Sequence, residues 1–146
     1  EIISYAKDLE SDYEKEKYVH NKLIDMLEYE VDSDLNQSAY SALVNGVTVC
    51  AGYARAFQHI MIALGVPTYY VTGDANGEHA WNIIKLPDGY YNVDVTWNDN
   101  ESNIYEYFNL DDDEFDSTHS RDELSLQLPE CNGKDYRKEY LSIYGF

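Results

Sequence analysis

The sequence predicts an α+β fold in which one helix packs against an antiparallel sheet. Apolar residues recur at helical spacing over residues 50–64, and a glycine and a proline follow as a typical helix end. Two strand-like stretches, 79–85 and 90–97, are joined by Leu86-Pro87-Asp88-Gly89, which indicates a hairpin. We therefore expect a helix and a hairpin to form the core.

The elements around this core follow from local signals. Ser11 begins a capping-box pattern that predicts a helix at about 11–29. A shorter helix at 38–44 should end at Asn45-Gly46, and the β-branched segment 47–49 is typical of extended chain. Residues 68–72 have the composition of a strand. The first helix should bury a stripe made of Val19, Leu23, Met26 and Leu27.

Length and charge restrict the domain count and the partners. The 146 residues suit a single domain, 1–146, with a C-terminal extension at about 111–146. We expect the apolar residues of 124–146 to close over the sheet. The 28 acidic residues against 10 Lys and Arg give a net charge of −18, which argues against nucleic acid as a partner. No run approaches the roughly 20 apolar residues of a membrane span, so we expect no membrane insertion. The start at Glu1 without a leader is typical of a processed or excised piece. We also expect the protein to be a monomer.

The chain has two cysteines, Cys50 and Cys131, too few for a disulfide framework. Cys50 stands at the expected first turn of a helix, where unpaired N–H groups and the helix dipole favour a thiolate. The alternative for Cys50 is a small apolar core residue. Cys131 lies in a predicted turn and is expected to be an incidental thiol.

Cys50, His79 and Asp94 together have the chemistry of a thiol nucleophile, its base and the residue that orients the base. If residues 86–89 form a four-residue loop, His79 and Asp94 are diagonal neighbours with Cβ atoms about 7–8 Å apart. A loop one residue shorter would turn one strand over and separate them. We expect Nδ1 of His79 to face Asp94 and Nε2 to face Cys50.

The other histidines are expected to be structural or exposed to solvent. His59 is half a turn out of phase with Cys50 on the same helix and should point away from it. His20 belongs to the polar side of the first helix. His119 follows an acidic stretch and is expected to cap it or pair with it.

Three segments of the sequence resemble the motifs of the bacterial transglutaminase-like superfamily, relatives of the papain-like cysteine enzymes. They are Val49-Cys50-Ala51-Gly52-Tyr53-Ala54, His79-Ala80-Trp81-Asn82 and Val93-Asp94-Val95-Thr96-Trp97. The resemblance covers a motif core at about 38–110. It implies a papain-like, transglutaminase-like α+β core, with Cys50 as nucleophile on a helix packed against an antiparallel sheet. It further implies His79 as general base and then acid, and Asp94 as orienter.

The resemblance also sets expectations about the reaction. Animal transglutaminases place Gly-Gln-Cys-Trp around the nucleophile, whereas this chain has Thr48-Val49-Cys50-Ala51. We therefore favour hydrolysis of peptide or carboxamide bonds over cross-linking, with a protein, a peptide or a cell-wall peptide as substrate and without a cofactor. By analogy with secreted bacterial relatives, the expected location is extracellular or at the cell surface.

Two alternatives to the enzyme hypothesis stay open. One is a catalytically inactive module that binds protein or cell wall through its tyrosine-rich surface. The other is a metal site formed by Cys50, His79 and Asp94, whose ligand types suit zinc.

Weaker candidates complete the site. Tyr40 lies upstream of the nucleophile, where papain-like enzymes keep an oxyanion side chain, although a core tyrosine is the simpler interpretation. Trp81 and Trp97 could form the walls of a substrate groove, or belong to the core. The acidic stretches 98–101 and 111–114 lack the ligand pattern of a calcium loop, and we expect a solvated loop and a helix start there.

Overall fold

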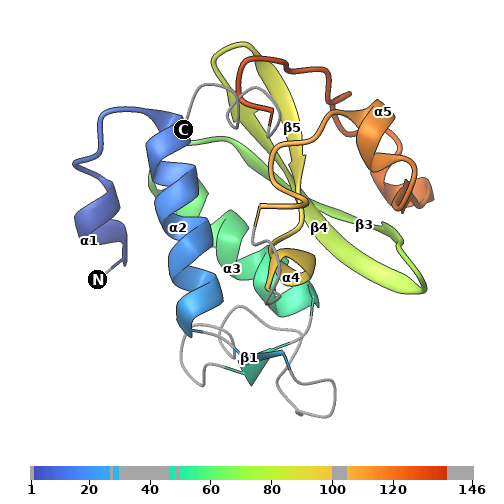
Figure 1. Cartoon of the computed structure of the whole chain (residues 1–146), viewed down its shortest axis with the longest axis horizontal. Coiled ribbons are helices and arrows are strands. Elements are labelled where there is room, and N and C mark those ends of the chain that lie inside the picture. Colours follow the sequence, from blue (N-terminus) through green and yellow to red (C-terminus); the bar gives the residue numbers. More distant parts are fainter. Residues whose placement is uncertain (1, 27, 30–46, 49, 100–104, 138–146) are drawn as a thin grey trace.

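The computed structural model describes residues 2–26, 28–29, 47–48, 50–99 and 105–137. A four-stranded antiparallel sheet lies at the centre, with α1, α2 and α3 on one side and α5 on the other (Figure 1). The predicted α+β class is confirmed. The predicted short helix at 38–44 lies outside the described residues.

Two helices precede the core. Helix α1 spans Ile2–Ala6 and α2 spans Asp12–Met26. Ser11 caps α2 as predicted, because its Oγ accepts a hydrogen bond from the Glu14 amide at 3.1 Å. Of the predicted stripe, Val19 and Leu23 are fully buried and Met26 is half exposed, while Leu27 lies outside the described residues.

Helix α3 spans Cys50–Ala63 and begins at the predicted residue. Gly65 follows it with a φ of 84°, the left-handed conformation that glycine provides at helix ends. Its buried face contains Tyr53, Phe57 and Met61, as the helical spacing predicted. This face packs against the sheet and holds the first turn of the helix, with Cys50, in a fixed place.

The sheet has the strand order β5-β4-β3-β6, and all neighbours are antiparallel. The strands are β3 at Thr68–Asp74, β4 at Glu78–Leu86, β5 at Gly89–Val93 and β6 at Ser120–Arg121. Lys85 faces Tyr90, which is the predicted register, and the chain reverses over two residues because Leu86 also pairs with Gly89. A separate parallel pair joins β1, Glu28–Tyr29, to β2, Val47–Thr48.

The second strand of the hairpin is shorter than predicted. The sequence predicts a strand up to Trp97, but β5 ends at Val93 and a short helix, α4, spans Val95–Asn98. Asp94 is the cause, because its side chain caps α4 by accepting a hydrogen bond from the Trp97 amide at 3.0 Å. Capping outweighs the strand preference of Val95 and Trp97.

Each face of the sheet carries its own core. The first core lies between the sheet and α1, α2 and α3, and Asn82 of β4 ties the two layers together. Its Nδ2 donates to the Ala54 carbonyl of α3 and to the Tyr69 carbonyl of β3, each at 3.0 Å. The sheet and the start of α3 are thereby linked.

The second core lies on the opposite face and is closed by the C-terminal part of the chain. Helix α5 spans Asp112–Phe115, and a 3₁₀ turn spans Glu123–Ser125. Phe115, Cys131 and Leu128 pack against Trp81 and other residues of the sheet. The expectation that apolar residues of 124–146 close over the sheet is confirmed for Leu128 and Cys131, whereas Leu124 and Leu126 are exposed.

Candidate active site

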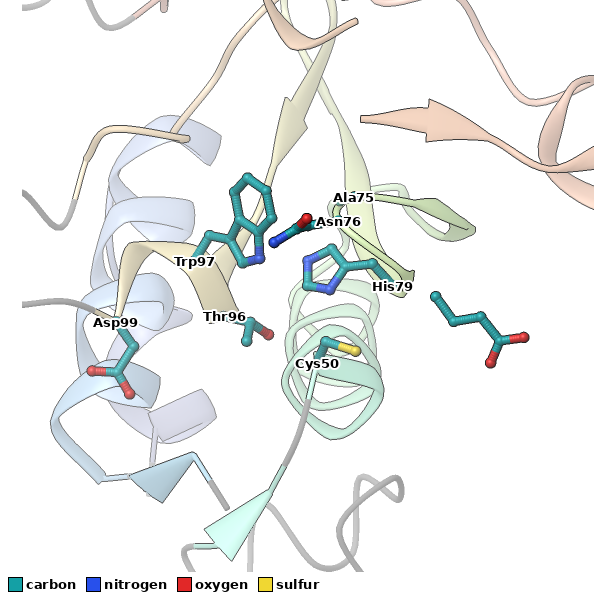
Figure 2. Close-up of a pocket in the computed structure, with 8 residues that line it drawn as sticks. Cys50, Ala75, Asn76, His79, Thr96, Trp97 and Asp99 are labelled. Atoms are coloured by element: carbon teal, nitrogen blue, oxygen red, sulfur yellow. The ribbon is translucent and has the colours of Figure 1, made fainter. Parts of the chain in front are cut away.

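Cys50 is the first residue of α3 and is partly exposed at the end of the sheet where β4 begins. It lies beside His79, the second residue of β4, at a pocket of about 420 Å³ (Figure 2). Both cysteines are free, as predicted. The pocket is lined by Cys50, Ala75, Asn76, Glu78, His79, Thr96, Trp97 and Asp99.

His79 and Asp94 are in direct contact, as the predicted hairpin register requires. His79 Nε2 lies 2.7 Å from Asp94 Oδ2. The predicted nitrogen is wrong, because we expected Nδ1 to face Asp94. Nε2 is at the tip of the ring, and Asp94 caps α4 just beyond the end of β5 instead of lying in a strand beside His79. Nδ1 is then the nitrogen left for Cys50.

Asp94 is fully buried and surrounded by hydrogen-bond donors. Its Oδ1 accepts the Trp97 amide at 3.0 Å, and its Oδ2 accepts from His79 and also from Nε2 of His119 at 2.7 Å. Burial alone would raise the pKa of this carboxyl, but the hydrogen bonds and charges of His119 and His79 hold the pKa below its usual range. Asp94 is therefore a fixed anion.

The pKa of His79 is shifted in the opposite direction. Burial disfavours the imidazolium, but hydrogen bonds to Asp94 and Cys50, with the charges of both groups, raise its pKa to about 9. His79 is consequently protonated at neutral pH. An imidazolium beside Cys50 can form an ion pair with a thiolate, which is the reactive form of a cysteine.

The remaining histidines differ from expectation in two of three cases. His59 is exposed and points away from the site, as predicted. His20 is fully buried rather than on a polar surface, and burial lowers its pKa to about 4. His119 is also buried and pairs with Asp94 instead of the acidic stretch before it. No local sequence signal links His119 to Asp94, because the contact depends on how the chain returns to the sheet.

The three weaker candidates differ in where they lie. Trp81 is 2% exposed, packs in the second core and is not among the residues that line the pocket. Trp97, the other tryptophan considered for a groove wall, lines the pocket. Tyr40 lies outside the described residues.

The acidic stretches do not form an obvious cation site. Asp111 caps α5 by accepting a hydrogen bond from the Glu114 amide at 2.9 Å, so the stretch 111–114 is a helix start as predicted. Only the first half of the stretch 98–101 lies within the described residues.

One cluster could offer ligand atoms to a metal ion. One atom each from His79, Asp94 and His119 lie within 4.8 Å of one another, and Cys50 is not part of this set. Both histidine nitrogens are, however, at hydrogen-bonding distance from the same carboxylate oxygen. The cluster is thus arranged around Asp94 rather than around a central ion.

Among the described residues, none of the helices combines the length and the apolar character needed to cross a bilayer.

Comparison with known proteins gives a family match and structural relatives. The sequence model of the transglutaminase-like superfamily matches residues 3–95. No match was found among curated proteins. Among solved structures, a TGase has a TM-score of 0.58 at 18% identity, over 65% of this chain and 29% of that chain. A candidate cysteine protease from Cytophaga hutchinsonii has a TM-score of 0.58 at 23% identity, over 65% of this chain and 36% of that chain.

A third structure extends the fold likeness. A candidate protease from Parabacteroides distasonis ATCC 8503 has a TM-score of 0.50 at 9% identity, over 62% of this chain and 22% of that chain. The chain therefore spans between 22% and 36% of the length of these three structures. At these identities, the likeness shows the shared fold.

Proposed function

The chain belongs to the transglutaminase-like superfamily, and on this basis we propose that it is a cysteine-dependent acyl-transfer enzyme acting on peptide or carboxamide bonds. One observation carries the proposal: Cys50 begins a helix beside His79, whose other side is held by the buried Asp94 carboxylate. A nucleophile, a base and an orienting acid in this order are the requirements of thiol catalysis.

The first half of the reaction forms a thioester. The Cys50 thiolate adds to the carbonyl carbon, and the oxyanion is stabilised by backbone N–H groups in the first turn of α3, which have no partner within the helix. The tetrahedral intermediate collapses by breaking the C–N bond. His79 gives its proton to the departing nitrogen, so that an amine or ammonia leaves and the acyl group stays on Cys50.

The second half returns the enzyme to its starting state. His79, now neutral, takes a proton from water, the resulting hydroxide attacks the thioester, and the acid departs as the Cys50 thiolate is released. Two features support water over an amine as acceptor. The pocket is partly lined by polar side chains, including Asn76 and Thr96, and Val49 and Ala51 replace the Gln and Trp that flank the cysteine of animal transglutaminases.

We propose a peptide-type substrate on the basis of the pocket's place at the surface. A protein or peptide chain, including a cell-wall peptide, fits a pocket that lies at the surface and exposes Cys50. An extracellular or cell-surface location stays a prediction.

A donor–acceptor screen tests this proposal. Wild type, Cys50→Ala and the control Cys131→Ala are incubated with casein or a muropeptide alone, and with a glutamine-bearing peptide plus dansylcadaverine. Cleavage or deamidation that is lost in Cys50→Ala and kept in Cys131→Ala supports a hydrolase. Dansyl incorporation faster than hydrolysis would identify a cross-linker instead, and equal results for wild type and Cys50→Ala would indicate an inactive module.

A further inference from the structure

His119 is the feature of the site that the proposed reaction does not use. It lies between α5 and β6, and its side chain is fully buried. The segment that matches the superfamily ends at residue 95, so this histidine comes from a part of the chain beyond the match. Its Nε2 is nevertheless 2.7 Å from the Asp94 oxygen that contacts His79.

The Asp94 Oδ2 atom is shared by the two histidines. A carboxylate oxygen has two lone pairs, and here one is directed to His79 and the other to His119. The two rings lie 5.7 Å apart between centroids and are tilted by 55°, so they approach the oxygen from different directions. With the Trp97 amide on Oδ1, the carboxylate is fixed at both ends.

His119 is itself held rigidly. Its backbone amide donates to the Phe115 carbonyl at 2.9 Å, and its Nδ1 lies 2.7 Å from the Thr118 hydroxyl. On its other side, Ser120 pairs with Asp74 at the start of β6. Aromatic rings surround the imidazole, with centroid distances of 3.8 Å to Phe115, 4.6 Å to Trp97, 4.9 Å to Trp81 and 5.9 Å to Tyr107.

We propose that His119 is a positioning residue of the active site, whose Nε2–H holds Asp94 in the orientation that aligns His79 with Cys50. This inference rests on the proposed function. His119 does not line the pocket, so it acts on the reaction through Asp94 and His79 rather than by touching substrate. A phenylalanine at this position would fill the aromatic space but would leave the buried Asp94 carboxylate with one hydrogen-bond donor fewer, so packing alone does not require the donor that His119 provides.

Two substitutions separate positioning from packing. His119→Gln keeps an N–H donor at a similar distance from the backbone but loses the aromatic stack. His119→Phe keeps the stack on Phe115 but loses the donor. Positioning predicts that His119→Gln is the more active variant, whereas packing predicts that His119→Phe is.

The kinetic test uses p-nitrophenyl acetate as acyl donor and iodoacetamide as a probe of Cys50. We expect His119→Phe to lose on the order of 10- to 100-fold in kcat with little change in KM, as supporting residues behind an active site commonly do. Alkylation of Cys50 at pH 6 should slow in parallel. His119→Gln should recover most of both rates. Equal rates in wild type and His119→Phe, or a slower His119→Gln than His119→Phe, would overturn the proposal.

A measurement on the wild type keeps the proposal testable if a variant fails to fold. Long-range ¹H–¹⁵N NMR of the histidine rings should show a proton on Nε2 of His119, with a resonance that moves in Asp94→Asn. An unprotonated Nε2 would refute the donor role. A wild type without Cys50-dependent turnover and with a slow Cys50 would instead remove the proposed function, which distinguishes the two failures.

Discussion

Asp94 shows how one side chain can set both local structure and chemistry. It ends β5, caps α4 with one oxygen and gives the other oxygen to His79 and His119. The backbone is fixed as well, because the Asp94 amide donates to the Tyr107 carbonyl at 3.0 Å. A buried anion of this kind needs all of its donors, since an unpaired buried charge is costly.

Substitution Asp94→Asn should separate these roles. An asparagine keeps the cap on α4 but has no charge to stabilise the His79 imidazolium. The pKa of His79 should fall from about 9 towards its ordinary value of 6.5, measured by NMR titration. We expect kcat to fall on the order of 10³- to 10⁴-fold, by analogy with the loss of the orienting aspartate in a catalytic triad.

The control for this substitution is Glu78→Gln, which removes a carboxylate from the pocket at the residue next to His79. The Glu78→Gln substitution should leave the pKa of His79 at about 9. An unchanged His79 titration in Asp94→Asn would contradict the role assigned to Asp94.

The sequence predicts which residues meet in the site better than it predicts which of their atoms make the contacts. Motif chemistry and hairpin parity place His79 against Asp94, and helix phase correctly turns His59 away. The prediction that Nδ1 of His79 contacts Asp94 was wrong, because the orientation of the ring does not follow from the strand register. His119 was missed, because the contact with Asp94 joins parts of the chain without a shared local pattern.

At the scale of elements, the contact between β3 and β6 determines where His119 lies. Gly73 of β3 pairs with Arg121, and a Cβ at this glycine would lie 2.0 Å from the Ser120 carbonyl oxygen. The two backbones are therefore too close for any side chain at this position. Strand β6 can pair with β3 only if residue 73 is a glycine, and β6 begins one residue after His119.

We therefore expect Gly73→Ala to push β6 away from β3 and to move His119. Backbone cannot retreat as a flexible side chain can, so the free energy of unfolding should fall by about 1–3 kcal/mol. Turnover of p-nitrophenyl acetate should fall with it. Denaturant unfolding and kinetics test this expectation, with the exposed substitution Lys85→Ala as a control on the same sheet. If Gly73→Ala keeps the stability and the turnover rate of wild type, then the position of β6 is not needed to keep His119 in the site.

Local propensity explains which elements the sequence predicted. The ends of α3 and the hairpin register follow from glycine, proline and period-two patterning, which act over a few residues. Strand preference at Val95 and Thr96 was misleading, because the Asp94 cap is a competing interaction that composition does not reveal. Strand β6 has only two residues, which is too short for a sequence pattern to predict. Its position depends on the close approach to β3 at Gly73.

At the scale of the whole molecule, a buried polar cluster joins α2 to the segment after α4. Glu16 is fully buried, and its Oε1 accepts a hydrogen bond from Asn109 at 2.9 Å, while Oε2 has no hydrogen-bond partner among the described residues. Burial raises the pKa of Glu16 to about 8. His20 of the same helix contacts Asn98 of α4 at 3.0 Å.

These groups predict how stability varies with pH. Glu16 holds its proton up to about pH 8 in the folded state but loses it near 4.5 when unfolded, so its contribution is lost as pH rises. His79, with a folded pKa of about 9 against 6.5, acts in the same direction. His20, with a folded pKa of about 4, loses its contribution as pH falls below 6.5. Stability should therefore be greatest between about pH 4.5 and 6.5.

The substitution Glu16→Gln tests the alkaline side of this profile. A glutamine keeps an acceptor for Asn109 but does not titrate. Between pH 6.5 and 8, the free energy of unfolding of wild type should fall by up to about 2.7 kcal/mol per pH unit, since both Glu16 and His79 contribute. In Glu16→Gln only His79 contributes, so the slope should be half as steep. Chemical unfolding at several pH values gives both slopes. Parallel profiles would mean that Glu16 is ionised in the fold.

The α+β class was predictable because independent signals in the sequence agree. Helix pattern, hairpin parity and three motifs in order all indicate one α+β arrangement, and the superfamily match confirms it. The buried positions of Glu16 and His20 were not predictable, because the polar side of α2 is contacted by Asn98 and Asn109, which lie far along the chain. A helical pattern shows which side is apolar, but not what packs on the other side.

The most direct test of the account measures the reactivity of Cys50 against pH. Native protein is treated with iodoacetamide from pH 5 to 8, and the labelled peptides are quantified by mass spectrometry. Burial raises the pKa of Cys131, which should stay unlabelled and serve as an internal control. We predict fast labelling of Cys50 already at pH 6, lost in His79→Ala. A Cys50 rate that rises about tenfold per pH unit from 6 to 8, equally in wild type and His79→Ala, would contradict the account.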